Sequence, residues 1–171
     1  MYFKQFPKTM YSYTKGGKKN FTAVTDIFRR VIVSKFIPDA SRLRKHYVGD
    51  GDTPEILSHK LYGNAQYHWV ILLINNIVDV NKEWPLSQED LVTYCEDKYG
   101  ANNIKDTHHY VLASDNTVIV DWDATKVNNG TYKEVTNFEY EENLNEEKRQ
   151  ILVLGSEYIF SMKSQFKKLI K

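Results

Sequence analysis

The chain has 171 residues, a formal net charge of +1 and an aromatic content of 13%. The near-neutral charge argues against nucleic-acid binding, which normally needs a strongly basic face, and the longest apolar run, residues 69–74, is too short to span a bilayer. Because Cys95 is the only cysteine, the sequence holds neither a disulfide framework nor a cysteine-rich zinc site. We therefore expect a soluble product, a single domain or a small domain with extensions, assembled in a reducing compartment.

The first segment, residues 1–19, is rich in aromatic residues but has no sustained helical or strand period. Disordered tails are normally poor in aromatic residues, so we interpret this segment as an extended arm that docks either on its own body or on a neighbouring protein. Residues 25–30 can begin a short helix or turn, and residues 31–36 suit either its continuation or a strand, because periodicity does not distinguish the two.

The central part of the sequence carries a strand signal followed by two helix signals. Residues 43–48 alternate as in a short strand. Thr53 is a good helix N-cap, Pro54 suits the first helical position and Gly63 suits a helix end. Apolar residues at helical spacing from Trp69 onward predict a second helix, so we expect two short helices packed as a pair.

A third helix is expected over residues 88–99, because Ser87 and Asp90 have the form of a capping box and Gly100 closes the apolar stripe. The period then changes from helical to alternating. Residues 110–122 predict a β-hairpin, and residues 131–140 predict a possible third strand.

The carboxyl-terminal part combines an acidic segment, a strand and an amphipathic helix. The acidic residues 139–147 lead into a strand over 148–154. Ser156 is expected to cap the last helix, with lysines near its carboxyl end. The apolar face of this helix is formed by Ile159, Met162, Phe166, Leu169 and Ile170.

Local signatures of catalysis are missing from the sequence. It contains no zinc-protease, nucleophile-elbow, phosphate-loop or dinucleotide motif. His108 and His109 are adjacent, so in a regular strand they point to opposite faces and cannot share a metal ion. The carboxylate pairs Asp50–Asp52 and Asp121–Asp123 are unspecific, because acidic residues are common at helix starts and strand ends. We expect no catalytic residue, metal or cofactor.

Several central motifs resemble the LysM module, a strand-helix-helix-strand unit known chiefly for binding glycans that contain N-acetylglucosamine. The motifs are Tyr47-Val48, Gly51-Asp52-Thr53, Leu61-Tyr62-Gly63 and Asn75-Asn76. If the resemblance extends to function, it implies a glycan groove formed by Asp50, Gly51, Asp52, Thr53, Asn75 and Asn76.

A broader resemblance covers most of the chain except residues 123–136. It rests on residues 1–7, 25–29, 61–72, 84–89 and 145–151. Together these segments resemble the LysM-containing baseplate wedge proteins of contractile-tailed bacteriophages. The resemblance implies a non-enzymatic virion protein, assembled in the host cytoplasm, that clamps neighbouring wedges in a six-fold ring around the hub through contacts with other wedge and hub-proximal proteins. It implies no nucleic-acid partner and no membrane insertion.

The expected fold is α+β, with a LysM-like strand-helix-helix unit, a following helix, a small antiparallel β region, the arm and the terminal amphipathic helix. The expected division is 1–42, 43–100 and 101–171. A glycan-binding module and a small cell-wall hydrolase remain as alternatives. The residues expected to contact partners are Tyr2, Phe3, Phe6, Tyr11, Tyr13, Phe28, Arg29, Trp69 and Trp84.

Overall fold

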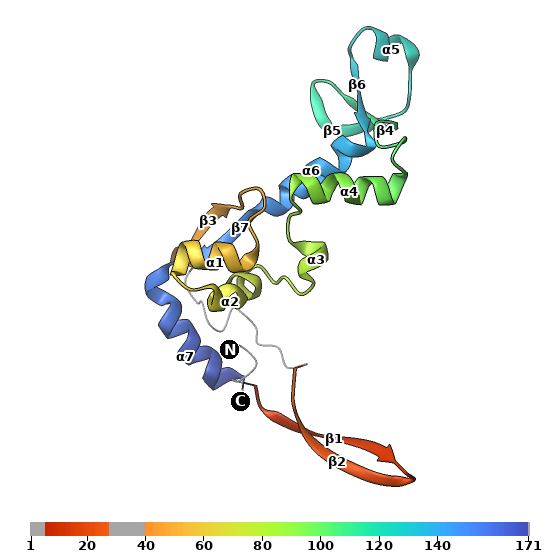
Figure 1. The fold of residues 1–171 in the computed structure, drawn as a ribbon. Coiled ribbons are helices and arrows are strands. Elements are labelled where there is room, and N and C mark those ends of the chain that lie inside the picture. Colours follow the sequence, from red (N-terminus) through yellow and green to blue (C-terminus); the bar gives the residue numbers. More distant parts are fainter. Residues whose placement is uncertain (1–5, 28–39, 171) are drawn as a thin grey trace. The chain divides into compact units, whose positions relative to one another are not determined.

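The computed structural model describes residues 6–27 and 40–170. These residues form seven α-helices and three small sheets, which confirms the expected mixed α+β class (Figure 1). No helix in this part of the chain is both long enough and apolar enough to cross a membrane. The expected partner residues Tyr2, Phe3, Phe28 and Arg29 lie outside the described residues, as do residues 28–30 of the helix or turn expected over 25–30 and the continuation or strand expected over 31–36. No helix begins at Thr25, which is the last residue of the strand Lys18–Thr25.

The described residues divide into two compact units, each built from separate parts of the chain. The first unit takes those within 1–46, 53–80 and 151–171, and the second takes 47–52 and 81–150. The chain therefore leaves the first unit after the second helix and returns to it near its carboxyl end. The division into three consecutive segments stays a prediction.

Besides an N-terminal hairpin, the first unit contains a second two-stranded sheet, a helical pair and a terminal helix. The second sheet pairs β3 with β7, and the bonds from Val48 N to Arg149 O and from Gly155 N to Arg42 O, at opposite ends of the pair, show that the strands run antiparallel. The strands belong to this unit except for Tyr47 and Gln150. The elements are η3 (Ala40–Arg42), β3 (Leu43–Tyr47), α1 (Pro54–Tyr62), η4 (Ala65–Tyr67), α2 (His68–Ile74), β7 (Gln150–Leu154), η5 (Ser156–Tyr158) and α7 (Ile159–Leu169).

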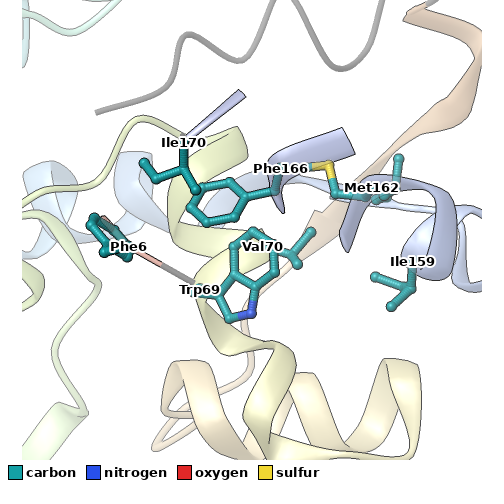
Figure 2. Packing of buried hydrophobic residues seen from close by; sticks show 8 residues of the cluster. Phe6, Trp69, Val70, Ile159, Met162, Phe166 and Ile170 are labelled. Carbon is teal, nitrogen blue, oxygen red and sulfur yellow. The ribbon is translucent and has the colours of Figure 1, made fainter. Parts of the chain in front are cut away.

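The core of the first unit joins the start, middle and end of the chain (Figure 2). Phe166 is fully buried, and its ring centroid lies 4.8 Å from that of Trp69 and 6.0 Å from that of Phe6. The buried cluster consists of Phe6, Trp69, Val70, Leu154, Ile159, Met162, Phe166 and Ile170. The helical pair thus depends on α7, which lies about 90 residues further along the chain, for its apolar cover.

The expected caps of α1 are confirmed. The Thr53 hydroxyl accepts a hydrogen bond from Ile56 N at 3.3 Å, and Pro54 occupies the first turn, where no backbone donor is needed. Gly63 ends the helix with φ +70°, a left-handed conformation that costs glycine little. The second helix is also confirmed, although it ends at Ile74, shortly before the left-handed Asn76 with φ +55°.

The expected cap of the terminal helix is wrong, whereas most of its apolar face is confirmed. Ser156 begins the 3₁₀ turn η5, and α7 starts at Ile159 without a side-chain cap. The apolar face is buried at Ile159, Met162, Phe166 and Ile170, but Leu169 is 43% exposed.

The N-terminal arm contains a β-hairpin, which the sequence analysis did not predict. β1 (Lys8–Lys15) pairs antiparallel with β2 (Lys18–Thr25) around Gly16 and Gly17, whose φ values of +60° and +75° fit a type I′ turn. Apolar side chains lie on both faces of this hairpin, so neither face shows the one-sided alternation that identifies a strand.

The second unit packs two helices together and carries a three-stranded sheet. α4 lies alongside α6, and the strand order is β5-β4-β6 with antiparallel pairs (Figure 1). The third helix and the hairpin after it are confirmed. The elements are α4 (Gln88–Tyr99), β4 (Thr107–Leu112), β5 (Asp115–Val120), α5 (Ala124–Asn128), β6 (Tyr132–Thr136) and α6 (Asn137–Arg149), and the short α3 (Val80–Glu83) precedes them.

The largest correction concerns residues 137–149, which form α6 instead of the end of a strand and an acidic segment. The third strand stops at Thr136 because this residue and Glu139 form a capping box: Glu139 N donates to Thr136 Oγ1 at 3.2 Å, and Thr136 N donates to Glu139 Oε2 at 2.9 Å. The following strand, expected over 148–154, is accordingly shorter and begins at Gln150.

We predict that Phe166→Ala destabilises the first unit by about 3–5 kcal/mol, because the truncation leaves a cavity against Trp69 and Phe6. Urea unfolding measures the change. Phe160→Ala on the same helix is the matched control, since Phe160 is 74% exposed, and its effect stays within about 0.5 kcal/mol. Equal effects of the two substitutions would contradict the assigned core.

Candidate functional site

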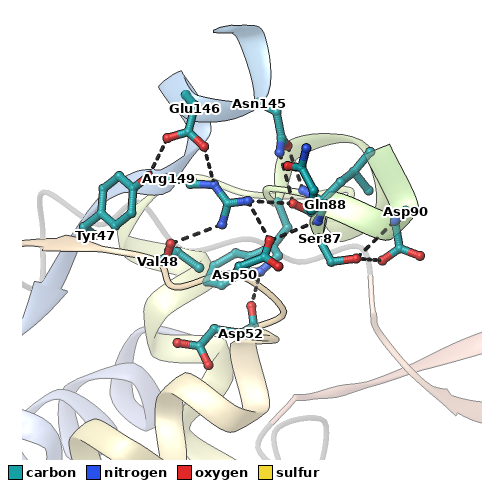
Figure 3. A network of polar contacts seen from close by, with 12 residues as sticks. Tyr47, Val48, Asp50, Asp52, Ser87, Gln88, Asp90, Asn145, Glu146 and Arg149 are labelled. Carbon is teal, nitrogen blue, oxygen red and sulfur yellow. Dashed lines mark hydrogen bonds and ion pairs between the residues drawn. The ribbon is translucent and has the colours of Figure 1, made fainter. Parts of the chain in front are cut away.

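The guanidinium of Arg149, at the carboxyl end of α6, is the centre of a polar network in the second unit (Figure 3). Its Nη2 donates to Asp50 Oδ1 at 3.0 Å and to Leu86 O at 3.1 Å, and its Nε donates to Glu146 Oε1 at 2.8 Å. Its Nη1 donates to Val48 O at 3.3 Å. Only 5% of the Arg149 side chain is exposed, so these bonds replace the water that the charge has lost.

The ion pairs also set the protonation of this site. Burial lowers the pKa of Arg149, but the hydrogen bonds to Asp50 and Glu146 outweigh it and raise that pKa above its ordinary value. The Tyr47 hydroxyl donates a hydrogen bond to Glu146, and this bond is the main reason that the pKa of Tyr47 is raised. Arg149 and the Tyr47 hydroxyl therefore both stay protonated at neutral pH.

Two further side chains fix the segment before α4. Asn145 accepts from Leu86 N at 2.7 Å and donates to Leu86 O at 3.0 Å, so its amide satisfies both backbone groups of one residue. The indole N–H of Trp84 donates to Asp52 O at 2.8 Å. Together with Arg149, these residues hold the loop 47–52 and the segment 84–88 against the end of α6.

A second polar cluster lies between α4 and α6. Glu141 is buried and accepts hydrogen bonds from Lys98 Nζ and from the Tyr99 hydroxyl, both at 2.7 Å. Burial alone would raise the pKa of Glu141. The two hydrogen bonds lower this pKa by more than burial raises it, so the net shift is downward. Cys95 is fully buried, which raises the pKa of its thiol and keeps it protonated and unreactive.

The residues of the expected glycan groove fall in different units. Asp50, Gly51 and Asp52 belong to the second unit, and Thr53, Asn75 and Asn76 belong to the first. Asp50 also accepts from Gln88 N at 3.0 Å. The side-chain amide of Asn75 donates to Leu152 O at 2.8 Å and accepts from Leu152 N at 2.8 Å, which extends the pairing edge of β7.

The expected partner residues separate into buried and exposed ones. Phe6 and Trp69 lie in the core of the first unit, and Trp84 is 5% exposed in the second, so these three side chains pack against their own chain. Tyr11 and Tyr13 lie on the hairpin and are 58% and 42% exposed. They remain available to a partner.

A hollow of about 990 Å³ in the second unit is lined by one face of α6 and by the sheet strands beside it. His108 and His109 line it together, with their Nδ1 atoms 2.8 Å apart, and the His108 ring stacks on Tyr140 at 4.0 Å. The opposite orientation expected for the two histidines is wrong, because β4 has a bulge between Thr107 and His109. No group of three or more ligating side chains suited to a metal ion occurs among the described residues.

Two of the four carboxylates considered for catalysis have local structural roles. Asp123 Oδ1 caps α5 by accepting from Thr125 N at 2.9 Å and from Lys126 N at 3.2 Å. Asp50 pairs with Arg149. Neither carboxylate needs a catalytic role to explain its position.

These features are those of a structural protein, because the polar clusters are bonded within the chain and several large side chains of the hairpin are exposed. A family model described as "Base plate wedge protein 53" matches residues 1–132, and the chain belongs to this family. It is accordingly a structural protein of the phage tail baseplate, as the family resemblance predicted.

A relative in this family is the baseplate wedge protein gp53 of Enterobacteria phage T4. The two chains are 35% identical over 69 residues, which cover 40% of this chain and 32% of the T4 protein. The match thus spans about a third of the relative's length.

Sequence reasoning missed Glu141, Asn145 and Arg149, the residues that build the two polar clusters. Their spacing of four places them on one face of a helix. The Thr-x-x-Glu motif at 136–139 is a capping box that predicts the start of that helix. Recognising α6 would have grouped the three residues, although not identified their partners.

We predict that Arg149→Met destabilises the second unit by roughly 2–4 kcal/mol, because Val48 O loses its buried side-chain donor and Leu86 O loses one of its two. Arg149→Lys recovers only part of the loss, since one ammonium cannot reproduce the guanidinium fork. The control Arg44→Met breaks an exposed 3.5 Å pair with Glu157 and costs less than about 1 kcal/mol. Chemical denaturation compares the three, and equal costs for Arg149→Met and Arg44→Met would refute the role of the network.

A pH dependence is predicted for the histidine pair. Burial is the main cause that lowers the pKa of His109 below its ordinary 6.5, and the neighbouring His108 is the second. The His109 ring therefore binds a proton more readily in the unfolded chain than in the folded one. The resulting stability is present above pH 6.5 and is lost as the pH falls through the folded pKa. NMR titration of the ring and unfolding at several pH values measure it. His109→Gln should flatten the dependence, and a His109 ring that titrates above 6.5 would contradict the prediction.

Proposed function

We propose that the chain clamps neighbouring wedges of the baseplate together around the hub, through protein–protein contacts with other wedge and hub-proximal components. Membership of the baseplate wedge family supports this role. The proposed setting is a six-fold ring, assembled in the host cytoplasm, without contacts to nucleic acid.

The hairpin β1–β2 is the observation that carries the proposal. Isolated two-stranded hairpins are at best marginally stable in water, and neither strand of this one is buried. Several of its large side chains are exposed, namely Met10 (65%), Tyr11 (58%), Tyr13 (42%), Phe21 (63%) and Val24 (37%). Contact with a partner would both cover these side chains and stabilise the hairpin.

The way the hairpin is attached to the chain also suits a clamp. Phe6, two residues before β1, is 8% exposed and packs on Phe166, so one side of the hairpin is attached to the core of the first unit. A contact made by the hairpin is thereby connected to a folded body. Tyr11 and Tyr13 are the proposed anchors, because tyrosine offers a large apolar ring and a hydroxyl that remains hydrogen-bonded.

A LysM-like character of the first unit forms part of this proposal. The order β3, α1, α2 and then β7 follows the strand-helix-helix-strand pattern, with residues 81–150 inserted before the last strand. The glycan-binding alternative has weaker support, because the side chains of Asp50 and Asn75 already bond within the chain. We therefore favour a LysM-like unit that serves protein contacts.

The proposal predicts that replacing residues 8–25 by a short Gly-Ser linker prevents the chain from joining wedges into complete rings. Reconstitution with the other wedge proteins of the same phage, followed by electron microscopy, measures ring yield. Tyr13→Ser should lower the yield, whereas Tyr94→Ser is the matched control, because both tyrosines are 42% exposed and Tyr94 lies on α4. Complete rings at unchanged yield without the hairpin would disprove the clamp role of the arm.

A further inference from the structure

The outer edge of β1 is an unpaired strand edge whose central residues are uncharged. Asp26 N donates to Pro7 O at 2.9 Å, and the register then places each odd-numbered residue of β1 in a hydrogen-bonded pair with β2. The backbone groups of the even-numbered residues Lys8, Met10, Ser12 and Thr14 therefore point outward. No strand covers this edge among the described residues.

The charges of this strand lie only at its ends. Lys8 and Lys15 bracket six uncharged residues, and the whole hairpin, residues 8–25, contains four lysines and no acidic residue. Exposed strand edges invite pairing with another chain unless charges or bulges prevent it. Two hairpins of this kind repel each other, so the complementary strand must be acidic at its ends.

The second unit presents such a strand. β5 is at the edge of the sheet β5-β4-β6, with β4 on one side and no described strand on the other. Its residues 116–120 are uncharged and are bracketed by Asp115 and Asp121. The register against β4 shifts between Asp115 and Ile119, and Thr117 N donates to Asp115 Oδ1 at 3.0 Å, so the regular part of this edge is its carboxyl end, at Ile119 and Val120. Ile119 is 70% exposed and Val118 is 39% exposed, and Trp122 just beyond the strand is 65% exposed.

The two edges match in charge. The regular part of β5 ends beside Asp121, and the lysine at either end of β1 can meet this carboxylate, so an ion pair forms in either strand direction. Like edges do not pair, because lysines would meet lysines and aspartates would meet aspartates.

We propose that the β1 edge of one copy pairs with the β5 edge of a second copy, extending its three-stranded sheet by the two strands of the hairpin. The contact joins two different surfaces, so it is heterologous. When every copy makes the same contact with the next, the copies form a ring if the rotation between neighbouring copies adds up to a full turn. This inference rests on the proposed clamp role of the arm and names a second copy of the chain as the hairpin's partner.

Sedimentation velocity of the purified full chain tests the contact directly. We expect concentration-dependent association that weakens with salt, because the bracketing ion pairs are exposed. Lys8→Glu with Lys15→Glu lowers the association constant roughly tenfold or more. The control Lys167→Glu with Lys168→Glu makes the same charge change on exposed positions of α7 and has little effect.

A second pair of variants separates strand pairing from general charge attraction. Ser12→Pro removes an outward N–H and leaves the bonds within the hairpin intact, so it abolishes association, whereas Ser12→Ala keeps the N–H and associates normally. If Ser12→Pro associates as well as Ser12→Ala, pairing at the β1 edge is refuted.

Carbodiimide cross-linking of a mixture of ¹⁵N-labelled and unlabelled chain identifies the partners. Mixed-isotope peptides should link Lys8 or Lys15 to Asp115 or Asp121. A chain that sediments as a monomer at every concentration, or mixed-isotope links only between other residues, overturns the inference. In that case loss of wedge rings on hairpin deletion would still support the clamp role, with a different baseplate protein as the occupant of the hairpin.

Discussion

The buried guanidinium of Arg149 imposes the strictest constraint on the second unit. A charge with only 5% of its side chain exposed must be neutralised and hydrogen-bonded, and here two carboxylates and two carbonyl groups do so. These groups come from the loop 47–52, from the segment before α4 and from α6 itself. Because the fork of the guanidinium has fixed directions, all three segments must take one arrangement. Arg149 O also accepts from Val48 N, so the same residue begins the pairing of β3 with β7.

The first unit is organised by apolar burial. Phe166 is surrounded by side chains from the start, the middle and the end of the chain, and the helical pair alone has too little apolar surface to form a comparable core. The strand β7 returns to this unit after the inserted residues 81–150, and Asn75 bonds both backbone groups of its residue Leu152. Apolar packing and the two hydrogen bonds from the Asn75 side-chain amide thus hold β7 in place together.

The hairpin contrasts with the rest of the two units, and this contrast bears on function. Outside the hairpin, polar side chains such as Asn145 and Glu141 are bonded and apolar ones such as Phe166 are buried, as in a framework protein. The hairpin has the opposite character, with apolar side chains exposed on both faces and an open edge. A structural protein of a large assembly needs both parts: rigid bodies that keep their geometry, and surfaces that are completed only by a neighbour.

The sequence by itself determined the features that depend on a few neighbouring residues. Thr53, Pro54 and Gly63 fix α1, Ser87 and Asp90 start α4, and the spacing from Ile159 to Ile170 defines the buried face of α7, because caps and helical periodicity act within one or two turns. The same kind of signal at Thr136 and Glu139 would have identified α6. The tertiary structure alone decided that Phe6 lies in the core, that Arg149 has partners about 100 residues away, and that His108 and His109 meet at a bulge. Such contacts depend on which segments are brought together after long loops close, and no local pattern encodes that choice.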